Sequence, residues 1–183
     1  MATATIEVSA VASGDWTLDT GADEVTAVQY GGSHDDDTSK IQSLNVIGST
    51  QVYDCTVGGL AVGDTVTQVD VIARCKRALS ADAGFTIGYS FTLSPSGTQS
   101  GTSGTQTSTS TWTTFTYTHS GLSAVYGSGF QLTITTTQTR YLECSTLYAE
   151  VTYTPAAGGA GQPYTARVRL VPGMGRAHGH QGW

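Results

Sequence analysis

The sequence predicts an all-β protein: an antiparallel β-sandwich or jelly roll followed by an extended C-terminal arm. Apolar and polar residues alternate with period two along most of the chain, and helical periodicity is nearly absent. Threonine, which favours pleated strands, is heavily used, and 23 glycines supply turn positions. Only 12% of the residues are charged, about half the usual share for a soluble domain.

The alternating segments give about eight to ten short strands, the number expected of a sandwich or jelly roll. Turn-forming stretches such as "VGGLAVGD" and "YGSG" separate them. In chain order the expected strands are 3–11, 24–30, 40–47, 50–57, 64–79, 84–93, 110–119, 129–138 and 139–154.

Two segments leave alternatives open. In "TWTTFTYT", the aromatic residues Trp112, Phe115 and Tyr117 do not share one parity, and a bulge near Thr113–Thr114 would restore them to one face. The threonines would then line the other face, either solvated or against another subunit. The low-complexity segment 94–111 is either a flexible loop or a long hairpin with Ser/Thr-rich arms.

Composition divides the chain into a folded domain, 1–154, and a Gly-rich linker with an extended arm, 155–183. All 14 acidic residues and five basic ones lie in the first part, whose formal charge is −9, whereas the second part carries +3. The acidic body is not expected to bind nucleic acid. No stretch is apolar enough to span a membrane, and the N-terminus lacks a signal-peptide pattern, so we expect synthesis in the cytoplasm.

Cys55, Cys75 and Cys144 lie in strand-like segments without metal-binding spacing. We expect buried or half-buried reduced thiols, since one disulfide plus a free thiol would need an oxidising compartment.

The acidic run "SHDDD" is the main candidate for a cofactor site. Asp35, Asp36 and Asp37 form either a solvated acidic loop or a calcium site, and no other cofactor is expected. The chain shows no nucleophile or phosphate-loop motif, and no pair stands out among the carboxylates Asp15, Asp70, Glu143 and Glu150. The sequence therefore predicts a non-enzymatic protein.

Tyrosines outnumber phenylalanines, nine to four. Sandwich domains can bind sugars through exposed aromatic side chains, whereas a tyrosine in a sandwich is more often half-buried with its hydroxyl at the rim. A carbohydrate-binding site formed by exposed aromatic residues with adjacent carboxylates is therefore an alternative function.

Four stretches resemble, in order, a jelly-roll module of the virion proteins of tailed bacteriophages. They are "DWTLDTGADEVTAVQ…DDDTSKIQS" (15–43), "LAVGDTVTQVDVIARCKRA" (60–78), "STWTTFTYTHSGLS" (110–123) and "RYLECSTLYAEVTYTP" (140–155). These are strand and turn patterns with no catalytic residues. The resemblance implies a structural role in the virion as a capsid decoration (cement) protein, head fibre or tail-fibre module.

Because the chain has no fibre repeat, we expect a capsid decoration protein that binds the major capsid protein and itself, as a homotrimer or another symmetric oligomer. The arm would make the contacts, since an isolated strand and a Gly-rich end cannot fold alone. Alternatives are a carbohydrate-binding adhesin or tail-fibre module, for which a glycan is the partner, and a subunit of a tail or extracellular filament. The expected contact residues are Tyr164, Arg167, Arg169, Val171, Arg176 and Trp183.

Overall fold

The computed structural model describes residues 1–30, 38–79 and 82–157, and all the regular elements in these ranges are β-strands. The predicted all-β antiparallel sandwich is confirmed. No helix in the described part of the chain could cross a membrane. The strands are β1 (Ala2–Gly14), β2 (Thr17–Thr20), β3 (Lys40–Gln42), β4 (Thr50–Val57), β5 (Thr65–Arg77), β6 (Ala83–Leu93), β7 (Thr98–Thr102), β8 (Gln106–Ser108), β9 (Thr113–Thr136) and β10 (Leu142–Thr154).

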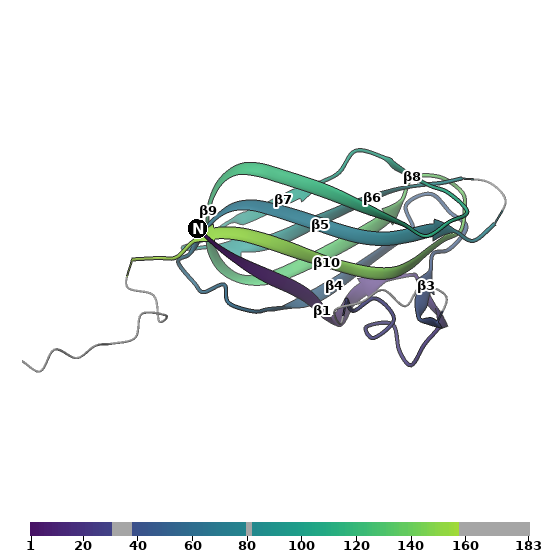
Figure 1. Ribbon diagram of the computed structural model, residues 1–183, viewed down its shortest axis with the longest axis horizontal. Helices are drawn as coiled ribbons and strands as arrows, with labels where there is room; N and C mark the ends of the chain where they lie inside the picture. Colours follow the sequence, from purple (N-terminus) through teal and green to yellow (C-terminus); the bar gives the residue numbers. More distant parts are fainter. Residues whose placement is uncertain (31–37, 80–81, 158–183) are drawn as a thin grey trace, which may run out of the picture.

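The strands form two packed layers (Figure 1). The front layer consists of the first half of β9, then β5, β10 and the start of β1, with β3 and β2 at the edge. The rear layer consists of the end of β1, then β4, the second half of β9, β6 and β7, with β8 also on β6. The strands β1 and β9 thus belong to both layers.

The long strand β9 crosses between the layers within the segment 120–129. Val125 still pairs with Thr65 of β5, whereas the next residue, Tyr126, pairs with Leu93 of β6. Gly121 has a φ of 73° and Gly129 a φ of 55°, a left-handed conformation that glycine adopts without steric cost. These two glycines explain how one strand can serve both layers.

The core lies between the layers and is formed by alternate residues of each strand. Phe91 and Phe130 stack with their ring centroids 5.6 Å apart, and Tyr89 stacks on Phe130 at 5.9 Å. The largest fully buried aliphatic side chains are Ile6, Ile41, Ile87, Leu132, Ile134, Leu142 and Leu147. Burial of this period-two set fixes the register of each strand, because a slip of one residue would expose it.

Two strand-level expectations are wrong. The ladder between β5 and β9 runs without a shift from Thr113 to Ser120, so there is no bulge near Thr113–Thr114. Phe115 and Tyr117 point toward the core, whereas Trp112 precedes the strand and its ring lies 4.7 Å from the Lys76 ammonium. The contact with Lys76 explains why Trp112 does not share the alternation of Phe115 and Tyr117.

The second wrong expectation is a strand at 24–30. The Asp23 carboxylate accepts hydrogen bonds from the backbone N–H and the hydroxyl of Thr26 at 2.8 and 2.9 Å, and its carbonyl accepts from Ala27. This local pairing makes the segment a series of turns, because an Asp side chain competes with the strand ladder for backbone donors. For 94–111, the structure shows neither a plain loop nor a hairpin with its own two arms, since β7 and β8 each pair with β6.

Candidate ligand-binding face

The outer surface of the front layer presents a row of polar and aromatic side chains. On β10, Leu147, Ala149 and Val151 are buried, so the alternate residues Tyr148 and Glu150 point outward. Tyr148 pairs with Glu7 of β1 on one side and with Ile72 of β5 on the other. We call the side chains of Tyr30, Tyr148, Glu7, Asp70 and Glu150 the tyrosine face.

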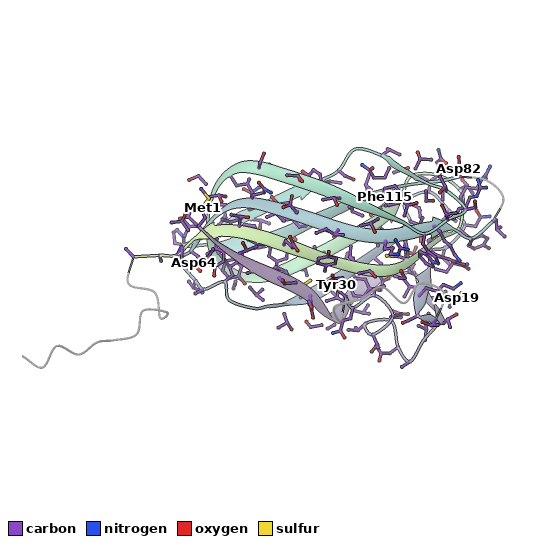
Figure 2. All side chains as sticks on the ribbon, in the orientation of Figure 1. Met1, Asp19, Tyr30, Asp64, Asp82 and Phe115 are labelled. Atoms are coloured by element: carbon purple, nitrogen blue, oxygen red, sulfur yellow. The ribbon has the colours of Figure 1, made fainter. Side chains whose placement is uncertain are left out.

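Tyr30 stacks on Tyr148, with ring centroids 4.3 Å apart and an angle of 14° between the ring planes. The turn that carries Tyr30 is tied to the front layer at two points. The Leu147 N–H donates to the Val28 carbonyl at 2.8 Å, and the Gln29 side chain donates to the Val8 carbonyl at 2.9 Å. Figure 2 shows Tyr30 over the front layer, beside β1 and β10.

Both tyrosine side chains are half-buried. Partial burial raises the pKa of Tyr148, and the neighbouring Tyr30 and Glu150 act in the same direction. The Tyr148 hydroxyl therefore stays protonated around neutral pH, where it can both donate and accept a hydrogen bond.

Carboxylates surround the stacked pair. Glu150 is exposed and pairs across the ladder with Asp70, which is half-buried. Asp70 accepts a hydrogen bond of 2.7 Å from the Gln68 side chain, which fixes one of its oxygens. Glu7 is half-buried opposite Tyr148. The tyrosine face thus combines a flat apolar surface with three groups that accept hydrogen bonds.

A charged cluster lies further along the same layer, at the end where β10 begins. The Glu143 carboxylate is 3.2 Å from the Lys40 ammonium and 3.4 Å from that of Lys76, and Lys40 is also 3.2 Å from Asp19. Burial by itself would lower the pKa of Lys40, but the hydrogen bonds to Glu143 and Asp19 outweigh this effect and raise it. The charges are therefore neutralised within the cluster, which favours a structural role.

The outer surface of the rear layer has a hollow of about 240 Å³. Gln131 of β9 donates a 2.9 Å hydrogen bond to Asp54 of β4 across its floor. The lining residue Phe91 is only 2% exposed, so the accessible wall is polar and offers no aromatic surface. The hollow is lined by Asp54, Ser90, Phe91, Thr92, Thr98, Gly129 and Gln131.

The site residues predicted from the sequence fall outside the described ranges. This holds for the calcium candidates Asp35, Asp36 and Asp37, and for the arm residues Tyr164, Arg167, Arg169, Val171, Arg176 and Trp183. Both sets remain predictions. Within the described ranges there is no group of three or more His, Cys, Asp or Glu side chains that could hold a metal ion.

The structure brings together some polar and aromatic residues that lie on different segments of the chain. Asp70 and Glu150 become cross-strand partners, and Tyr30 meets Tyr148 although the two are far apart in the chain. By contrast, Asp15 accepts hydrogen bonds from Ser49 and from the Thr50 N–H, a structural role. The sequence did not single out Glu7 as a candidate binding residue, although the alternation in 3–11 places it on the polar side of its strand.

Neither a family model nor a curated protein matches this sequence. Three solved structures show a distant likeness to the sandwich. The first contains the CBM22-1 and GH10 modules of a Clostridium thermocellum endo-1,4-β-D-xylanase complexed with xylohexaose, at 14% identity and a TM-score of 0.49, and the match covers 80% of this chain and 25% of that one. The present chain thus spans about a quarter of the length of that protein.

The second structure is the CBM22-1 xylan-binding domain of a Paenibacillus barcinonensis protein, at 14% identity and a TM-score of 0.45, covering 83% of this chain and 94% of that one. The third is the C-terminal CBM6 module of a laminarinase from Zobellia galactanivorans, at 12% identity and a TM-score of 0.42, covering 82% and 99%. At such distances no ligand follows for this chain.

Proposed function

We propose that this chain is a non-enzymatic binding module that recognises a neutral glycan on the tyrosine face. The observation that carries the proposal is the stacked pair Tyr30–Tyr148, held beside Glu7, Asp70 and Glu150 on one side of the sandwich. This is the combination of aromatic residues and adjacent carboxylates that distinguishes the carbohydrate-binding alternative from the other functions considered.

The chemistry of a sugar matches this face in two ways. A pyranose ring has a face of C–H groups, which pack against the electron-rich face of an aromatic ring. Its hydroxyl groups donate hydrogen bonds, and an ionised carboxylate accepts such bonds more strongly than a neutral group does. Because Tyr148 is half-buried and its strand lies in the middle of the layer, the ring is held in place before a ligand arrives.

Charge narrows the ligand class. The three carboxylates of the tyrosine face would repel uronic or sialic acid groups, as would the formal charge of −9 on residues 1–154. The proposed ligand is therefore an uncharged oligosaccharide.

A glycan array followed by calorimetry would test the proposal. We expect Tyr148→Ala to weaken binding of the best neutral glycan by about two- to tenfold, because a stacking contact contributes about 0.5–1.5 kcal/mol. Asp54→Asn in the rear hollow is the matched control and should leave the affinity unchanged. Binding only of acidic glycans, or loss of binding in Asp54→Asn with Tyr148→Ala unaffected, would overturn the proposal.

The virion role stays a prediction from the sequence. Capsid decoration, a homotrimer or other symmetric oligomer, and the location in a virion depend on residues 155–183, of which 158–183 lie outside the described ranges. At the start of this part, the Ala156 N–H donates a 2.9 Å hydrogen bond to the buried Asp64, next to the end of β10. A tail-fibre module that binds a glycan would satisfy both the virion hypothesis and the glycan-binding proposal.

A further inference from the structure

Cys75 and Cys144 face each other across the two central strands of the front layer. The register of β5 and β10 makes them direct Cα partners, with Lys76 opposite Glu143 and Arg77 opposite Leu142. Both cysteine side chains are fully buried in the core. The third cysteine, Cys55, lies on β4 in the rear layer.

Backbone hydrogen bonds show which kind of antiparallel pair the two cysteines form. The Leu142 N–H and carbonyl both bond to Ser43, on the side of β10 away from β5. The Arg77 N–H bonds to the Thr109 carbonyl, which lies away from β10. Leu142 and Arg77 are thus a non-hydrogen-bonded pair.

The pair type repeats every second residue along an antiparallel ladder. The register is unbroken from Leu142 to Cys144, so Cys144 and Cys75 are also a non-hydrogen-bonded pair. In such pairs the Cα atoms lie about 4.5 Å apart, and the side chains approach more closely than in hydrogen-bonded pairs. A disulfide needs a Cα separation of about 4.4–6.8 Å, so the backbone already has a suitable spacing.

The surroundings of the thiols support this geometry. The Cys144 thiol donates to the Thr146 carbonyl at 3.3 Å, just past an irregularity in the ladder between Cys144 and Thr146. Burial raises the pKa of the Cys75 thiol, and the adjacent Cys144 raises it further. The Cys75 thiol is therefore neutral and unreactive while the native fold is closed.

We propose that Cys75 and Cys144 are an oxidation site that forms a cross-strand disulfide with a small disulfide oxidant. The two thiols lose two protons and two electrons and form one S–S bond, while a molecule of oxidised glutathione takes up both and becomes two thiols. Cys75 lies two positions before the end of β5 and Cys144 two positions after the start of β10. Local opening of these strand ends gives the oxidant access, so oxidation is faster during folding than in the native state.

The test is to refold the full chain with oxidised glutathione and count free thiols after denaturation. We expect one remaining thiol, that of Cys55, and a linked peptide that contains Cys75 and Cys144. The chain-entropy model for a loop of this length predicts a melting temperature higher by roughly 10 °C, an increase that a reductant abolishes.

Variants separate this pairing from other oxidation products. Cys55→Ala should still form the link, whereas Cys75→Ala should keep both remaining thiols. If Cys75→Ala does not fold, peptide mapping of the unaltered chain still decides the question. All three thiols remaining free after oxidative refolding, or a link that includes Cys55, would overturn the proposal. The outcome is independent of glycan binding, so failure of either proposal leaves the other standing.

Discussion

Replacing the carboxylate of Glu143 by an amide tests whether the charged cluster stabilises the front layer. Its side chain is 8% exposed, and its partners Lys40 and Lys76 are 13% and 18% exposed. Breaking a fully buried ion pair by removing one partner costs about 3–5 kcal/mol, whereas an exposed pair contributes about 0–1 kcal/mol. The nearly buried setting here lies between these limits, and Glu143→Gln leaves the two ammonium groups close together without the intervening charge. We expect a loss of about 2 kcal/mol.

Urea unfolding followed by tryptophan fluorescence would measure this loss. With a dependence on urea of about 2 kcal/mol/M, which is typical for a small domain, the midpoint should fall by about 1 M. Glu150→Gln is the matched control on the same strand. It is exposed, so the free energy of unfolding should change by less than about 0.5 kcal/mol. Equal midpoints for the two variants would refute the reasoning.

Two further predictions concern packing and pH. A Cβ atom at Gly101 of β7 would lie 2.6 Å from the His119 ring and 2.8 Å from the Tyr117 hydroxyl, so Gly101→Ala should lower the free energy of unfolding by about 1–3 kcal/mol. At Gly104 a Cβ meets nothing within 4 Å, so the control Gly104→Ala should not destabilise the fold. Equal denaturation midpoints for the two variants would contradict this prediction. Because the folded-state pKa of Lys40 is raised above its ordinary value of 10.5, its contribution to stability is complete below that pH and is lost as the pH rises through the folded value. The stability gap between the unaltered chain and Lys40→Gln should therefore stay constant below pH 10.5 and narrow above it. A gap that widens above pH 10.5, measured by urea unfolding at each pH, would show that the sign is wrong.

The sequence by itself determined the fold class and most of the strands. Alternation in segments such as 64–79 and 84–93 is enough to predict β5 and β6, because a half-buried strand must place apolar side chains on one face. The expected strand at 24–30 was wrong because the Asp23 side chain captures backbone donors, a local competition that the pattern of apolar residues does not report.

Only the tertiary structure decided which outward residues meet. Tyr30 and Tyr148 are separated by most of the chain, and their stacking depends on the Val28 carbonyl docking on β10. The pairing of Cys75 with Cys144 likewise depends on strand order and register, which long-range burial sets. An alternation of period two shows which face of a strand is apolar, but it does not show which strand lies beside it. The sequence therefore contains the tyrosines, carboxylates and cysteines in plain view, whereas their assembly into sites depends on the tertiary structure.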